Sequence, residues 1–332
     1  MTSLTISAGF APGHDTPELV ALAEDLGYER AWMYDSPALY HDVWATLTLA
    51  AERTSRIGLG PAVLVPSLRH PMVNAAAIAT LVDRAPGRVA VAIGAGFTGR
   101  HVLGQRPMRW ADVREYILVL RALLRGDDAQ WEGATLRMMH PAGYSPARPI
   151  EVPIIVGADG PRGAAVAADV ADGIFAAGRP NRAASGDWNG LLQFGTVLDD
   201  GEALESPRVI EAAGPGVAVA LHARLEMAGP SAVDRVAGGE VWRAAVDSVP
   251  LDRRHLAIHE GHVVELTDRD RAALAAGATT RIPDLTLTGT ADDVRARVDA
   301  FAASGITELA YHPAGPDIER ELRAFARAVG LP

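Results

Sequence analysis

The chain contains no cysteine among its 332 residues, which excludes disulfide bonds, thiolate nucleophiles and cysteine metal ligands. Lysine is also absent, since all 31 basic residues are arginine, and this excludes a lysine Schiff base and a Walker phosphate loop. No apolar run approaches the roughly 18 residues needed to cross a bilayer. The first residues lack the basic start and long apolar stretch of a secretion signal. We therefore expect a cytoplasmic protein that does not enter a membrane.

The overall charge and composition limit which kind of protein this chain can be. The formal net charge is −10, which argues against a general role in binding nucleic acid. Apolar residues make up 48% of the chain and charged residues 22%, which is ordinary for a globular protein. At this length the chain can bury one large core or divide into two domains.

Residues 152–178 contain the pattern of a phosphate-binding βαβ unit. Val152 to Val156 is almost wholly apolar, as expected of a strand buried on both faces. Gly157 to Gly160 has the composition of a turn, and Pro161 suits the first turn of a helix. A strand over 174–176 follows, before a second glycine turn. A helix that starts after a turn of small residues presents free N–H donors to an anion, although such glycines also simply permit a tight turn.

Strands and helices alternate along most of the chain, which predicts a parallel (β/α)₈ barrel, an α/β fold of the TIM type. We expect a single domain over residues 1–332, with an insertion over 179–254 before the seventh strand. The run Thr290 to Asp293 predicts a helix start of the capping-box type. A doubly wound open sheet is the alternative, but no dinucleotide glycine fingerprint follows the first strand. The expected strands span residues 4–8, 29–34, 57–65, 89–93, 152–156, 174–176, 255–259 and 308–312.

In such a barrel the site lies at the carboxyl ends of the strands. Glycine and alanine predominate after the fourth, fifth and sixth expected strands, leaving room for a flat ligand whose phosphate contacts backbone donors. Ionisable side chains are few there. This combination favours a bound organic cofactor that carries the reaction itself.

Three other patterns each allow two interpretations. Gly94 to Gly99 approximates GxGxxG after a strand, a weak signal for phosphate contact. Asp35 is either catalytic or a buried partner for an arginine. His259 and His262 suggest metal ligands, but their spacing is not that of the zinc-protease motif and no third ligand is evident, so we expect no metal site.

Five segments in this order resemble the bacterial-luciferase-like flavin- or deazaflavin-dependent oxidoreductases. The likeness is greatest to the branch typified by F420-dependent methylenetetrahydromethanopterin reductase, and it covers nearly the whole predicted barrel. The segments include LAEDLGYERAWMYDSP and GRVAVAIGAGFTGRHVLGQRP; together they span residues 22–37, 54–71, 87–107, 152–178 and 287–309.

The resemblance implies a (β/α)₈ barrel, often a homodimer, that binds F420 or alternatively FMN across the strand ends. In F420-using relatives a bulge after the third strand, frequently with a non-prolyl cis peptide, backs the ring, and Ala62 and Val63 match it. The implied cofactor-binding residues are Ala62, Val63, Val65, Gly94, Ala95, Gly96, Gly157, Ala158, Asp159, Gly160, Ala177 and Gly178.

The chain departs from its relatives at three positions. Sugar-phosphate dehydrogenases of this branch have an Asp-His pair after the second strand, whereas here Ser36 follows Asp35. They also have a glutamate where this chain has Phe97, so a sugar-phosphate substrate is disfavoured. Asp159 places a carboxylate in the predicted phosphate turn, which repels a phosphate unless it turns away or pairs with Arg162.

The sequence therefore predicts an oxidoreductase in which F420 or flavin transfers hydride to or from a small organic substrate. The alternatives are an FMN-dependent monooxygenase supplied by a separate reductase, a non-catalytic binding relative, and, less favoured, a barrel hydrolase. Arg69, Arg100 and Arg106 are expected to favour an anionic substrate or cofactor tail. Asp35 is the expected catalytic residue, and the expected substrate-lining residues are Phe10, Tyr40, Phe97 and His259.

Overall fold

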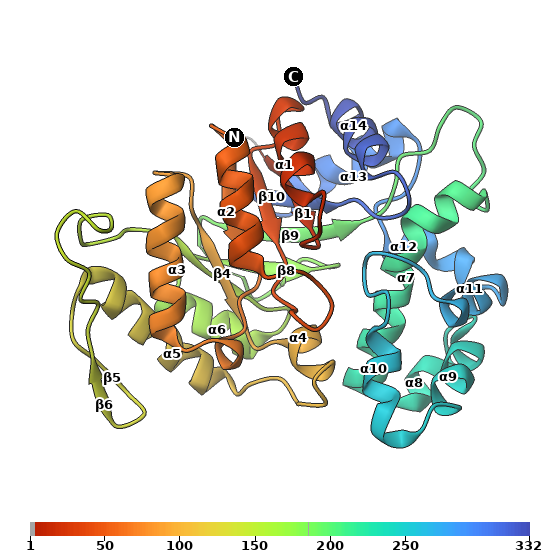
Figure 1. The fold of residues 1–332 in the computed structure, drawn as a ribbon. Helices are drawn as coiled ribbons and strands as arrows, with labels where there is room; N and C mark the ends of the chain where they lie inside the picture. The colour runs from red at the N-terminus through yellow and green to blue at the C-terminus, as the bar shows by residue number, and fades with distance from the viewer. Residues whose placement is uncertain (1–3, 185) are drawn as a thin grey trace.

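A barrel of eight parallel strands forms the centre of the computed structural model, which describes residues 4–184 and 186–332 (Figure 1). The strands follow the order β3-β2-β1-β10-β9-β8-β7-β4. Parallel bridges from Leu59 to Val89 and from Leu64 to Ile93 join β3 to β4 and close the ring. The predicted (β/α)₈ fold is therefore confirmed.

The barrel strands are β1 (Thr5–Phe10), β2 (Arg30–Met33), β3 (Gly58–Pro61), β4 (Val91–Gly94), β7 (Ile154–Gly157), β8 (Gly173–Ala177), β9 (Asn189–Phe194) and β10 (Glu308–His312). The helices around them are α1 (Thr16–Asp25), α2 (Val43–Arg53), α3 (Pro71–Arg84), α5 (Trp110–Arg125), α6 (Pro161–Val170), α13 (Ala291–Ala303) and α14 (Ile318–Val329). A short helix, α4 (Phe97–His101), follows β4, and a hairpin of β5 (Ala129–Trp131) and β6 (Ala134–Leu136) follows α5.

Local sequence explains most of these elements. Ile154, Ile155 and Val156 of β7 are fully buried, as expected of a strand covered on both faces. In α13, Thr290 accepts a hydrogen bond from the Asp293 backbone while the Asp293 carboxylate accepts one from Thr290, which is the predicted capping box. Within the described part of the chain, no helix is long and apolar enough to span a membrane.

A buried carboxylate closes the end of the barrel at which the strands begin. Glu308, the first residue of β10, accepts hydrogen bonds from the indole nitrogens of Trp32 at 2.7 Å and Trp188 at 2.6 Å. The Ser7 hydroxyl donates a third at 2.5 Å. The Arg30 guanidinium lies over both indole rings, 5.2 and 4.8 Å from their centroids. Trp32 is thus a core residue, and this end of the barrel is filled.

The seventh strand does not lie where the sequence predicts it. Residues 189–194 form β9, which pairs with β8 and β10, so the helical insertion follows the seventh strand instead of preceding it. The predicted strand over 255–259 is wrong, because these residues belong to the helix α10 (Arg254–His259). The segment NGLLQF gave no strand signal because glycine and glutamine interrupt its apolar pattern.

The segment between β9 and β10 is mainly helical and gathers on one side of the barrel (Figure 1). It buries a core of its own, in which Trp242 is fully enclosed and donates to Asp270 at 2.8 Å. That the whole chain is one domain stays a prediction. Besides α10, its elements are α7 (Pro207–Ala228), α8 (Pro230–Asp234), α9 (Gly239–Asp247), α11 (Asp268–Ala275) and α12 (Ile282–Leu285), with short 3₁₀ turns between them.

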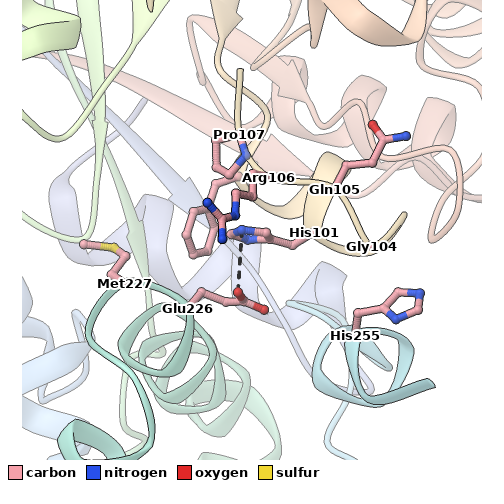
Figure 2. A pocket seen from close by; sticks show the side chains of 9 residues that line it. His101, Gly104, Gln105, Arg106, Pro107, Glu226, Met227 and His255 are labelled. Atoms are coloured by element: carbon pink, nitrogen blue, oxygen red, sulfur yellow. Dashed lines mark ion pairs between the residues drawn. The ribbon is translucent and has the colours of Figure 1, made fainter. Parts of the chain in front are cut away.

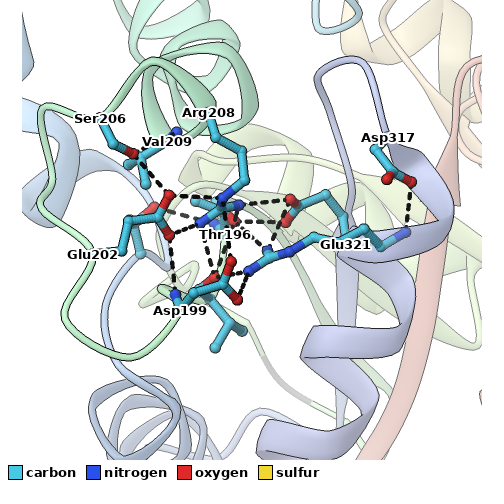
Figure 3. Close-up of polar contacts among 12 residues, drawn as sticks. Thr196, Asp199, Glu202, Ser206, Arg208, Val209, Asp317 and Glu321 are labelled. Carbon is cyan, nitrogen blue, oxygen red and sulfur yellow. Dashed lines mark hydrogen bonds and ion pairs between the residues drawn. The ribbon is translucent and has the colours of Figure 1, made fainter.

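Charged side chains connect the start of this helical segment to the barrel (Figure 3). Glu321 of α14 is almost fully buried and accepts hydrogen bonds from Thr196 at 2.6 Å and from Arg208 of α7 at 2.9 Å. Arg320 donates to the same carboxylate at 2.9 Å. On its other side Arg208 pairs with Glu202. A single arginine therefore links α7, α14 and the loop after β9.

The Glu202–Arg208 pair predicts a specific acid sensitivity. Hydrogen bonding by the Arg208 guanidinium lowers the pKa of Glu202 from 4.5 to about 2. Because the pKa is lower in the folded state, the ionised carboxylate stabilises the fold at pH values above its ordinary pKa. This stabilisation is lost as the pH falls towards 2. We expect Glu202→Gln to be less stable than wild type above about pH 5, with the difference shrinking below it. Urea unfolding across this range measures the effect.

The matched control is Glu205→Gln, because Glu205 lies three residues further along the same loop and is exposed. Its free energy of unfolding should differ little from that of wild type at every pH. If the free energy of unfolding of Glu202→Gln differs from wild type by a constant amount down to about pH 2, the stabilising role of the ionised Glu202 carboxylate is contradicted.

Candidate active site at the mouth of the barrel

One segment of the helical part lies against the mouth of the barrel, where the strands end. The Tyr40 hydroxyl, beyond β2, donates to the His262 carbonyl oxygen at 2.6 Å. The Thr98 hydroxyl, beyond β4, lies 3.1 Å from Nε2 of His262. His312, the last residue of β10, places Nε2 2.9 Å from the Val263 carbonyl oxygen. Three strand ends therefore position residues 261–263 beside the rim at which function is expected.

The predicted bulge after β3 is present. The peptide bond between Ala62 and Val63 is cis, as the family resemblance implied. Val63 packs against the ends of the next two strands: a Cβ built on Gly157 would lie 2.3 Å from Val63 Cγ1, and one built on Gly94 would lie 2.8 Å from Cγ2. These two glycines therefore make room for the Val63 side chain. Part of the glycine pattern that we interpreted as space for a ligand is internal packing.

The predicted phosphate turn is partly free to bind an anion. Gly160 is the N-cap of α6, no side chain caps this helix, and a Cβ built on Gly160 would meet no atom within 4 Å. By contrast, the Ala177 amide donates to Asp159 Oδ1 at 2.8 Å. The amides of Ala158 and Gly178 donate to neighbouring strands. Among the predicted contacts, the start of α6 is therefore what fits a phosphate.

Asp35 is held in an ion pair. Both carboxylate oxygens lie 2.7 Å from Nη1 of Arg69, and Oδ2 also accepts a hydrogen bond from the Val65 amide at 3.4 Å. The second Arg69 nitrogen donates to Asp42 at 2.7 Å. Burial raises the pKa of Asp35, and the Arg69 guanidinium opposes this rise. Of the two interpretations, the contacts support the buried arginine partner, and a catalytic role for Asp35 stays a prediction.

A pocket of about 590 Å³ opens between α4 and α7 (Figure 2). Phe97 and His101 line it from α4, and their rings meet edge to face with centroids 4.7 Å apart. Glu226 lines it from α7, and Figure 2 shows the His101 side chain directed at this carboxylate. Arg106 lies on the same wall with an exposed side chain. The pocket thus presents an aromatic ring, a carboxylate and a guanidinium.

Histidines gather beside this pocket. His259, at the end of α10, is fully buried, and neither of its ring nitrogens has a hydrogen-bond partner among the described residues. Burial, together with the nearby His101 and His255, lowers the pKa of His259 to about 4. Burial likewise lowers the pKa of His262 to about 3, and Nδ1 of His262 lies 3.2 Å from Nδ1 of His222. These imidazoles are therefore neutral at neutral pH.

The four predicted substrate-lining residues lie in different places relative to this pocket. Phe97 lines the pocket, and substrate contact by its ring stays a prediction. Phe10 does not line it, because its side chain is 3% exposed and belongs to the main hydrophobic core, so substrate contact by Phe10 also stays a prediction. Tyr40 is half-buried, and its hydroxyl is occupied by the His262 carbonyl. His259 lies behind the pocket wall in the histidine cluster, so substrate contact by this residue stays a prediction.

The three predicted arginines also have different roles. Arg69 is occupied by Asp35 and Asp42, and Arg100 donates to the Arg106 carbonyl oxygen at 2.6 Å. Only Arg106 lines the pocket among these three. Its side chain is exposed at the pocket.

Sequence reasoning missed the residues that complete the histidine cluster. The expectation of no metal site depended on the lack of a third ligand, but the fold brings His101, His222 and Glu226 to His259. His222 and Glu226 are four residues apart on α7, so they share one face of that helix. This spacing was the available signal, and it was overlooked because residues 179–250 showed little regular pattern.

A barrel with a closed bottom, a bulge after β3 and a pocket beside α4, the helix that follows β4, has the architecture of (β/α)₈ enzymes, whose sites lie at the carboxyl rim. The sequence pattern of the family described as luciferase-like monooxygenase matches residues 3–308. The chain belongs to the luciferase-like monooxygenase family.

A named relative is similar in sequence, and two solved structures share the fold. The 5,10-methylenetetrahydromethanopterin reductase of Archaeoglobus fulgidus is 27% identical over 328 residues, 93% of each chain. The coenzyme F420 dependent tetrahydromethanopterin reductase of Methanopyrus kandleri has a similar fold, with a TM-score of 0.67, 20% identity and 98% of each chain covered. The oxygenating constituent of 3,6-diketocamphane monooxygenase from Pseudomonas putida, in complex with FMN, also has a similar fold. Its TM-score is 0.61, its sequence identity is 13%, and 98% of each chain is covered.

The packing of Val63 predicts different effects for two neighbouring glycines. Gly157→Ala drives a methyl group into Val63, and we expect a loss of about 1–3 kcal/mol in the free energy of unfolding. Gly160→Ala points its methyl group into open space and should change stability by less than about 0.5 kcal/mol. Urea unfolding of both variants measures this difference.

A double variant tests the cause. Val63→Ala removes both Cγ atoms, so adding Gly157→Ala to it should cost much less than adding Gly157→Ala to wild type. If Gly157→Ala lowers the free energy of unfolding equally in wild type and in Val63→Ala, then Val63 is not the reason that position 157 requires glycine.

Proposed function

We propose that this protein is an oxidoreductase that uses the deazaflavin F420, with FMN as the alternative, to transfer hydride to or from a small organic substrate. The observation that carries the proposal is the placement of the Val63 bulge directly beside β7, whose following turn opens the uncapped start of α6. A ring resting on this bulge would have its phosphate-bearing arm within reach of free helix N–H groups.

The named relatives point the same way. The Methanopyrus kandleri structure is described as F420 dependent, and the Pseudomonas putida structure holds FMN. When bound, either cofactor supplies the two-electron chemistry. The chain would contribute a backbone surface at Ala62 and Val63 against one face of the ring, and amides at the start of α6 for the phosphate. The ring face of the site is apolar, since Val65 and Ala95 adjoin the bulge and carry no charge.

The substrate would enter from the pocket. Phe97 offers an apolar ring and Arg106 a cation, which suits a small organic molecule with an anionic group. Ser36 and Phe97 stand where sugar-phosphate dehydrogenases of this branch have histidine and glutamate, so we propose a substrate outside that class. We also infer a cytoplasmic homodimer, and an FMN-dependent reaction with oxygen would require a separate reductase.

Asp159 provides a test of the phosphate contact. Its carboxylate lies in the proposed phosphate turn, where a second negative charge is unfavourable. Asp159→Asn keeps the acceptor for the Ala177 amide and removes the charge, so we expect F420 to bind about fivefold more tightly, equivalent to roughly 1 kcal/mol. Gly160→Ala should weaken binding about tenfold by obstructing approach to the α6 amides. Fluorescence titration with F420 and with FMN measures both.

The matched control for charge is Asp169→Asn, since Asp169 lies on the outer face of α6 and pairs with Arg114. It changes the net charge equally and should leave the affinity unchanged. Tight FMN binding without F420 binding would select the alternative cofactor. Failure of the folded protein to bind either one would contradict the proposal and favour a non-catalytic relative.

A further inference from the structure

We propose that His101, Glu226 and His259 bind a divalent transition-metal ion at the wall of the pocket. The three residues come from α4, α7 and α10, and they meet only because the helical segment covers the barrel mouth. The inference does not depend on the cofactor, because none of these side chains belongs to the proposed cofactor contacts.

The donor atoms are spaced for coordination after small rotations. Nε2 of His101 lies 3.5 Å from one oxygen of Glu226, and Nε2 of His259 lies 3.9 Å from the other. One donor atom from each residue falls within 4.8 Å of the other two. In a tetrahedral zinc site with bonds of about 2.0–2.1 Å, ligand atoms lie about 3.3 Å apart. Figure 2 shows His101 and Glu226 already facing each other.

The buried nitrogen atoms are the second observation. His259 is 0% exposed, and within the described residues both its Nδ1 and its Nε2 lack a hydrogen-bond partner, as does Nδ1 of His101. Buried polar groups are nearly always paired, because an unpaired one costs about 1–3 kcal/mol. A metal ion would satisfy the His259 nitrogen that faces Glu226.

The two imidazoles and one carboxylate are ligands that suit a divalent transition metal such as zinc or iron. Imidazole nitrogen suits zinc, iron, cobalt and nickel, whereas calcium and magnesium prefer oxygen ligands alone. Neutral imidazole is the form of histidine that binds metal. Glu226 supplies a negative charge that partly compensates the ion.

A second set shares His259. His222, His259 and His262 also place donor atoms within 4.8 Å of one another. His222 and His262, however, already lie 3.2 Å apart through their Nδ1 atoms, and Nε2 of His262 contacts Thr98. We assign the ion to the Glu226 set because it carries the charge and because two of its residues, His101 and Glu226, line the pocket, which leaves a coordination position open towards a ligand.

The test uses the full-length protein after treatment with a chelator and without added cofactor. Titration with Co²⁺ should produce visible ligand-field absorption that saturates at equimolar metal, and Zn²⁺ should displace it. We expect His259→Ala to weaken Co²⁺ binding by at least about 100-fold and Glu226→Gln by at least about tenfold. Glu226→Gln changes no volume, so it remains informative if His259→Ala folds poorly.

The matched control is His255→Ala, because His255 lies on the same helix and lines the same pocket but belongs to neither ligand set. It should keep wild-type affinity. Absence of a cobalt spectrum in wild type, or equal losses for His255→Ala and His259→Ala, would overturn the proposal. Loss of binding in His222→Ala and His262→Ala with none in Glu226→Gln would overturn the assignment to this set. Because no cofactor is present, none of these outcomes depends on F420 or FMN binding.

Discussion

The contact between the Gly261 to Val263 segment and the barrel rim determines what the rest of the structure can do. Tyr40 beyond β2 donates a hydrogen bond to this segment, His312 at the end of β10 hydrogen-bonds to it, and Thr98 of α4 contacts it, so these three residues position it over the mouth. Val263 has a φ of 57°, a left-handed conformation that costs a β-branched residue roughly 1–2 kcal/mol. The surrounding contacts must outweigh that cost. These contacts fix the loop that follows α10, the helix that carries His259, against the rim.

The mouth has two chemically different sides. Around β3, β4 and β7 it is made of backbone and small apolar side chains, with Val63 as the protruding group and the start of α6 beyond it. Around α4, α7 and α10 it is made of neutral imidazoles and one carboxylate. The first side suits a flat cofactor with a phosphate, and the second suits a substrate or an ion. Asp35 lies between them but is occupied by Arg69, so it supports the rim.

Buried charges also explain why the barrel and its helical segment hold together. Glu308 accepts hydrogen bonds from two indoles and a serine at the closed end of the barrel. Glu321 accepts hydrogen bonds from two arginines where α7 begins. A buried carboxylate is tolerated only when its oxygens are satisfied, and both of these are. Neither role was visible beforehand, because the partners of each glutamate lie far from it in sequence: Ser7 and Glu308 are 301 residues apart.

By itself the sequence determined the barrel, the capping box of α13 and the glycine turn before α6, because each depends on neighbouring residues or on a repeated local pattern, whereas the Ala62–Val63 bulge was implied by the family resemblance. It placed the seventh strand wrongly, since NGLLQF becomes a strand only by pairing with β8 and β10. The direction of the Phe10 side chain was decided by tertiary structure, which buries it in the main core, because the end of a strand does not specify which way a side chain points. The histidine cluster was decided by tertiary structure alone. Its members come from separate helices, and only packing of the helical segment on the barrel brings their side chains within coordinating distance.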